Sequence, residues 1–124
     1  MLFRSLTALE RDRFEPTGGR HPYLSGVNRL ALSGWLRAAG RAHDAARLLM
    51  WNEAVVYPDG QTAHANAMLA GFAYLERARI EDALGQRALA REYYAQFLRR
   101  FDMPGPAQRH LVDEARTAVA RLAR

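Results

Sequence analysis

Apolar residues recur every three or four positions along most of this 124-residue chain, which is the spacing of an amphipathic helix. Good helix formers dominate the composition, because Ala stands at 23 positions and Arg supplies all 18 basic residues. Strand signals are weak, since β-branched residues are sparse and Val55-Val56 is the main such pair. The sequence therefore predicts an all-α protein with a single domain.

Pro and Gly divide the periodic segments and mark where each helix ends. Gly40 and Gly85 stand just after a helical segment, where glycine is favoured, and Thr62 is a predicted N-cap. The expected helices cover residues 2–13, 22–39, 42–55, 63–84, 87–101 and 107–123. The break at Glu15–His21 contains Pro16 and a Gly pair, so we expect an N-terminal arm over 1–21 and a helical domain over 22–123.

Two segments of the chain, 29–49 and 74–94, align with each other at an offset of 45 residues. Each has a helix, a turn at Gly40 or Gly85, and a second helix with Ala five residues after that Gly. An internal repeat of this kind is typical of architectures built from stacked helical hairpins.

The repeated pattern of a turn Gly, small residues and a late apolar or aromatic residue resembles the tetratricopeptide (TPR) repeat. The matching positions in the first copy are Leu32, Ser33, Leu36, Gly40, Ala45 and Leu49. Those in the second copy are Ala78, Gly85, Ala90, Tyr94 and Leu98. The second copy is also similar to C-terminal repeat regions of multidomain bacterial signalling proteins. The resemblance implies TPR-like antiparallel hairpins, an α-solenoid fragment, with the last helix as a C-terminal cap.

Small residues at the matched positions would let the two helices of each hairpin approach closely, with Ser33 against Ala45 and Ala78 against Ala90. The chain also departs from the family. Its offset exceeds the family period of about 34 residues, and Glu81 replaces an apolar or aromatic residue.

Catalytic and metal-binding patterns are missing from the sequence. The absence of Cys excludes a disulfide framework, a thiolate zinc site and a cysteine nucleophile. The four His residues have no metal-binding spacing, and only His64 with Asp59 and Glu53 could converge across a loop. We therefore expect no cofactor, no metal and no enzymatic activity.

The net charge of +5 raises an alternative function, a nucleic-acid-associated basic helical domain. The arginines are dispersed among carboxylates, and the stretch between Arg47 and Arg77 is acidic. A possible basic stripe on the fourth helix of the domain consists of Arg87, Arg91, Arg99 and Arg100. Basic ends around an acidic centre would also suit contacts between copies that weaken at high salt.

The expected function is protein–protein interaction without catalysis. The expected partner is a protein or peptide, and a second copy of this chain is one such partner. The arm could pack on its own hairpins or on the next subunit, which would give a homo-oligomer or filament. The aromatic set, Trp35 included, is interpreted mainly as core at helical spacing. The candidate partner contacts are Leu2, Phe3, Leu6 and Leu9 in the arm and Trp51 and Tyr57 beside the long connection.

Targeting signals are also missing. Arg4 and Glu10 interrupt the apolar residues of the N-terminus, so they do not form a signal peptide. No segment is long and apolar enough to predict a membrane span. A cytoplasmic location is the default expectation, and the sequence leaves export after processing open.

Overall fold

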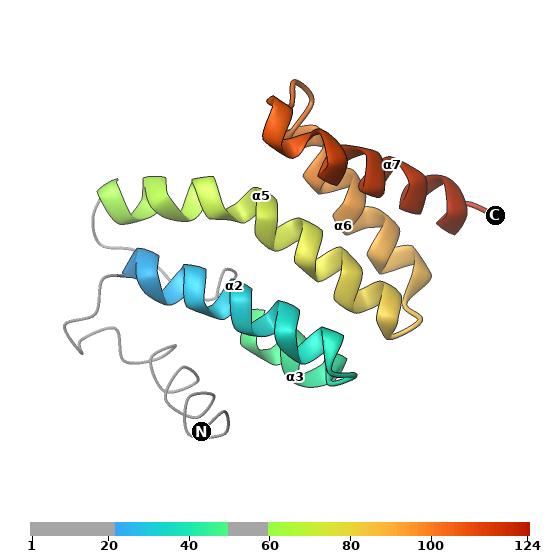
Figure 1. Cartoon of the computed structure of the whole chain (residues 1–124), viewed down its shortest axis with the longest axis horizontal. Helices are drawn as coiled ribbons and strands as arrows, with labels where there is room; N and C mark the ends of the chain where they lie inside the picture. Colours follow the sequence, from blue (N-terminus) through green and yellow to red (C-terminus); the bar gives the residue numbers. More distant parts are fainter. Residues whose placement is uncertain (1–21, 50–59) are drawn as a thin grey trace.

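The computed structural model describes residues 22–49 and 60–124, with side chains described from Gly26 to Leu49 and from Leu69 onward. Within these ranges the chain consists of helices and turns and contains no strand, which confirms the all-α prediction (Figure 1). The predicted arm at 1–21 lies outside the described residues.

Five α-helices and one short 3₁₀ helix make up the described part of the chain. They are α2 (Pro22–Ala38), α3 (Ala42–Leu49), α5 (Gly60–Ala83), α6 (Arg87–Arg100), η1 (Pro106–Gln108) and α7 (Arg109–Leu122). The predicted N-cap at Thr62 is wrong, because α5 already begins at Gly60 and Thr62 lies inside its first turn. N–H groups of a first turn need no partner within the helix, so a weak helix former such as Gly60 is tolerated there.

The helices form two hairpins: α2 packs against α3, and α5 packs against α6 (Figure 1). Gly40 has φ +77° and Gly85 has φ +76°, a left-handed conformation that favours glycine. In the first hairpin the Arg41 N–H donates to the Leu36 carbonyl at 2.8 Å, and the Gly40 N–H donates to Arg37 at 3.0 Å. These two bonds form a Schellman cap.

The second hairpin repeats this cap 45 residues later. The Gln86 N–H donates to the Glu81 carbonyl at 2.8 Å, and the Gly85 N–H donates to Asp82 at 3.1 Å. The following helices also begin alike, since the Ala45 N–H donates to Arg41 and the Ala90 N–H donates to Gln86. The two hairpins therefore share one turn geometry.

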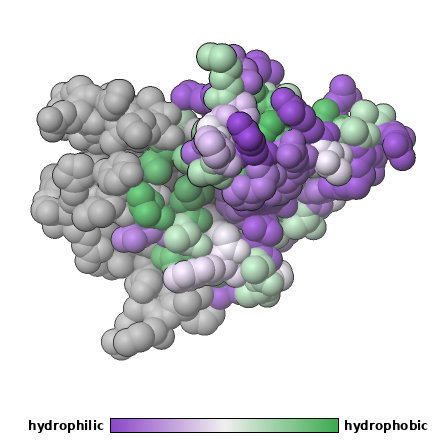
Figure 2. Space-filling view, turned by 45° about the horizontal axis from the view of Figure 1, so that its top comes forward, coloured by the Kyte–Doolittle hydropathy of each residue, from purple (hydrophilic) through white to green (hydrophobic). Residues whose placement is uncertain are grey.

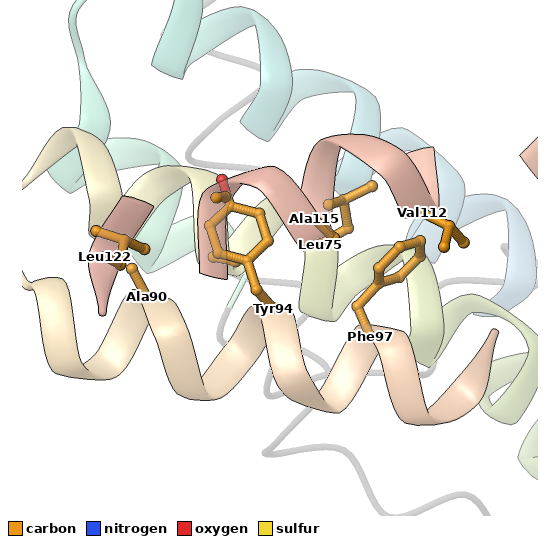
Figure 3. Close-up of a cluster of buried hydrophobic side chains, with 9 residues drawn as sticks. Leu75, Ala90, Tyr94, Phe97, Val112, Ala115 and Leu122 are labelled. Atoms are coloured by element: carbon orange, nitrogen blue, oxygen red, sulfur yellow. The ribbon is translucent and has the colours of Figure 1, made fainter. Parts of the chain in front are cut away.

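The long helix α5 belongs to both hydrophobic cores. One core lies between α5 and the first hairpin, and its buried residues are Leu36, Ala45, Leu48, Leu49 and Ile80. The other lies between α5, α6 and α7 (Figure 3), and its buried residues are Leu75, Ala78, Ala90, Tyr94, Phe97, Val112, Ala115, Ala118 and Leu122. Because α5 contributes apolar side chains to both sides, its apolar residues surround the helix and do not form one stripe.

Close approach at the end of α6 depends on a glycine in α5. A methyl group on Gly71 would lie 2.5 Å from the nearest atom of the Phe101 ring. The centre of this ring lies 4.8 Å from the centre of the Phe97 ring and 5.2 Å from that of the Phe72 ring. The lack of a side chain at Gly71 thus allows the aromatic ring of Phe101, at the end of α6, to reach the backbone of α5.

Candidate interaction surface

The residues predicted to pack within hairpins lie at the contacts between helices. Ser33, Ala45, Ala78 and Ala90 each have 0% exposure. The Ser33 hydroxyl also donates a hydrogen bond to the Ala45 carbonyl. Leu36, Leu49 and Tyr94 are buried in the cores, and Leu32 and Leu98 are partly buried against them. These positions hold the hairpins together and leave little surface for a partner.

The predicted partner contacts all lie outside the described residues, namely Leu2, Phe3, Leu6, Leu9, Trp51 and Tyr57. The predicted set of His64 with Asp59 and Glu53 also falls outside the described side chains. A candidate surface must therefore be sought on the helices themselves.

A row of ion pairs crosses three helices and ties the hairpins to α7. Glu76 of α5 is only 5% exposed and accepts from Arg37 of α2 at 2.6 Å and from Arg79 at 3.3 Å. Arg79 also donates to both carboxylate oxygens of Glu114 of α7, at 2.7 and 2.6 Å. A bidentate contact of this kind fixes the geometry of both side chains. The row joins sequence segments more than 30 residues apart, and no local pattern predicts it.

Titration of these groups follows from their contacts. The hydrogen bond from Arg79 lowers the pKa of the Glu114 carboxyl below its ordinary value and raises the pKa of Arg79. Burial raises the pKa of the Tyr94 phenol from 10.0 to about 12, because a phenolate is poorly solvated in the core. The shifts at the ion pair favour the charged forms of Arg79 and Glu114, and the shift at Tyr94 favours the neutral phenol.

The adjacent carboxylates Glu81 and Asp82 point to different partners. Glu81 is 4% exposed and accepts from Arg77, four residues earlier on the same helix, at 2.8 Å. Asp82 instead pairs with Arg121 of α7. The two carboxylates therefore form separate ion pairs and do not converge on one site.

Two arginines of the predicted basic stripe on α6, Arg87 and Arg100, have different neighbours. Arg87 donates to the Leu122 carbonyl of α7 at 3.4 Å, whereas the Arg100 guanidinium lies 5.8 Å from the centre of the Tyr74 ring of α5. These two side chains approach different neighbouring helices. The arrangement weakens the expectation of a continuous phosphate-binding face on α6.

The outer face of α2 is exposed, uncharged and mainly apolar. Trp35 is 66% exposed and Val27 37%, so the interpretation of Trp35 as core is wrong. The exposed residues of α2 with described side chains are Val27, Asn28, Ala31, Trp35 and Ala38, which we call the α2 face. None of them carries an ionisable group, although 25% of the chain is charged. They occupy one side of the helix, because their spacing follows the helical period.

The internal repeat gives Trp35 an equivalent residue in the second hairpin with the opposite exposure. Trp35 stands 45 residues before Ile80, so the two residues hold equivalent positions in the first and second hairpins. Ile80 has 0% exposure because the first hairpin covers it with Leu36, Leu48 and other apolar residues. In the described ranges no helix covers the α2 face in the way that the first hairpin covers Ile80.

The opposite end of the described helices is polar. The exposed residues of α7 are Arg109, His110, Asp113, Arg116, Thr117, Ala120 and Arg121. Figure 2 shows hydrophilic side chains over much of the described surface in that view, with hydrophobic ones gathered beside the grey residues. The exposed side of α7 is therefore mostly polar or charged, in contrast to the α2 face.

Comparisons with models of protein families, with curated proteins and with solved structures find no match for this chain. Among the described side chains, no group of three or more His, Asp or Glu residues could hold a metal ion. None of the helices in 22–49 and 60–124 is long and apolar enough to cross a bilayer.

Proposed function

We propose that this chain is a non-catalytic protein–protein interaction module, built from TPR-like helical hairpins, that binds its partner on the α2 face. One observation carries the proposal. Trp35 is 66% exposed at the position where Ile80, its equivalent in the second hairpin, is completely buried under neighbouring helices. The α2 face thus resembles the buried contact surface of α5, but no helix of the described residues packs on it.

The hairpin geometry supports the TPR-like part of the proposal. Both hairpins have the same glycine cap, at Gly40 and Gly85, and small residues where their two helices cross. Helical-repeat proteins bury one face of each unit against the next unit, and a terminal face without a cap stays apolar. The α2 face corresponds to such an end, whereas the charged outer side of α7 corresponds to a cap.

Energetics support the choice of the α2 face over other surfaces. Burying an exposed Trp contributes about 2 kcal/mol or more to binding, and large aromatics in the centre of a patch are typical anchors of protein interfaces. Ala31 and Ala38 beside it add apolar area and present no charge that would need a partner. A helix with an apolar stripe is the kind of partner that this face accepts.

A photo-crosslinking experiment tests the proposal. A benzoylphenylalanine residue replaces Ala38 on the α2 face, and in a matched control it replaces Ala120, which is also exposed, on α7. We expect irradiation of cells that produce the full chain to give discrete protein adducts from position 38 and not from position 120. Adding Trp35→Glu should abolish these adducts, and equal labelling from both positions would contradict the proposal.

A further inference from the structure

We infer that the partner on the α2 face is a second copy of this chain, bound through the same face about a two-fold axis beside Ala31. The inference rests on the proposed function and names its partner. In this arrangement the two α2 helices lie antiparallel, and each covers the apolar residues of the other.

The distribution of charge favours a contact between two α2 faces over a contact between the α2 face and α7. An end-to-end contact between the α2 face and α7 would bury the charged side chains Asp113, Arg116 and Arg121 against apolar ones. These side chains form ion pairs at the surface, and taking even a paired charge out of water is costly. A contact between two α2 faces buries no ionisable group. Arg37, the nearest charged side chain of α2, is turned toward α5 and held by Glu76.

Residue spacing makes the α2 face complementary to itself. Val27 and Trp35 each lie four residues from Ala31, which is about 6 Å along a helix. When two such helices run antiparallel with Ala31 at the axis, Trp35 of each copy lies opposite Val27 of the other. The small Ala31 allows the two backbones to approach at the crossing, and the large and small residues alternate on both sides.

The face of α5 that is equivalent to the α2 face is already covered by helices within the chain. Ile80, the equivalent of Trp35, packs against Leu36, Leu48 and Leu49 of the first hairpin. A two-fold contact at α2 would supply the same kind of cover from another copy. It closes after two chains and therefore gives a dimer, whereas a head-to-tail contact would continue into a ring or filament.

The absence of cysteine from the chain gives a direct test. The full-length Ala31→Cys variant places one thiol at the inferred axis, and Ala120→Cys places one on the charged side of α7 as a matched control. Under mild oxidation we expect Ala31→Cys to give a disulfide-linked dimer of twice the 14.0 kDa chain mass. Its yield should exceed that of the control about tenfold, because the dimer holds the two thiols together.

Two further measurements separate this contact from others. Adding Trp35→Glu to the Ala31→Cys variant should reduce dimer formation to the control level, while circular dichroism shows that the helices persist. The dimer measured by light scattering should persist at about 1 M salt, where charges are screened beyond about 3 Å. Loss of the dimer at high salt would overturn the inference in favour of charge-complementary contacts.

Other outcomes also overturn the inference. A monomeric Ala31→Cys chain would mean that another protein, and not a second copy, is the partner of the α2 face. A mixed dimer that forms only between Ala31→Cys and Ala120→Cys chains would mean head-to-tail contact. In both cases adducts from position 38 would still support the proposed function, so the failure of the inference is distinguishable from the failure of the function.

Discussion

The Ser33 hydroxyl donates a hydrogen bond of 2.9 Å to the Ala45 carbonyl oxygen, and both residues are completely buried between α2 and α3. The second hairpin has Ala78 and Ala90 at the equivalent positions, so it makes the same close approach without a hydroxyl. The first hairpin therefore has a polar contact that fixes how α3 lies on α2.

Ser33→Ala should lower the free energy of unfolding by about 1 kcal/mol, because it removes a buried hydrogen bond. Thr117→Ala is the matched control, since the Thr117 hydroxyl makes a similar bond of 2.8 Å to the Asp113 carbonyl on an exposed surface. We expect the control to change the free energy by less than about 0.5 kcal/mol. Urea denaturation measures both values, and equal effects would mean that burial of the Ser33 bond contributes nothing.

Gly40→Ala and Gly85→Ala should each destabilise the protein by about 1 kcal/mol, because both glycines have positive φ. No atom lies within 4 Å of a methyl group built on either residue, so the effect comes from the backbone and not from a clash. Gly40→Asn and Gly85→Asn should cost less, since Asn tolerates the left-handed conformation. Thermal unfolding would contradict this explanation if Ala and Asn had equal effects.

Glu76→Gln should destabilise the protein by about 1–3 kcal/mol, because it leaves Arg37 and Arg79 without the buried carboxylate between them. Glu92→Gln is the control, since Glu92 lies on the exposed side of α6. Chemical denaturation should separate the two variants clearly. A Glu76→Gln chain as stable as the control would show that the row of ion pairs adds no net stability.

Tyr94 predicts a loss of stability in alkaline solution. In the unfolded chain the Tyr94 phenol has a pKa of 10.0, whereas in the folded chain its pKa is about 12. Its contribution to stability is therefore complete below pH 10 and is lost as the pH rises through about 12. Tyr94→Phe should flatten this part of the profile of unfolding free energy against pH, and an unchanged profile would contradict the assignment to Tyr94.

Local features of the fold follow from the sequence. Glycine at positions 40 and 85 predicts where α2 and α5 end, because few other residues adopt the cap conformation. The period of apolar residues predicts helices, since tertiary contacts reinforce the same local preference. The N-cap signal of Thr62 predicts a start for α5 that is too late, because a helix can begin at any residue that its first turn tolerates.

Tertiary features do not follow from the same signals. The apolar pattern of α2 is the same whether a neighbouring helix covers it or not, so periodicity alone assigned Trp35 to the core. The burial of Glu76 depends on Arg37 and Arg79, and the first of these lies 39 residues away in the sequence. Ion pairs between helices depend on how the helices pack, and the spacing of residues within one helix does not determine that packing.

The difference between the two ends of the fold gives it a direction for lengthening by gene duplication. A hairpin added after α7 would have to bury charged residues such as Asp113 and Arg116, and it would need several compensating substitutions at once. A hairpin added before α2 would meet Trp35 and Ala31, which already have the chemistry of an internal contact. Longer descendants of this chain would therefore gain units at the amino-terminal side.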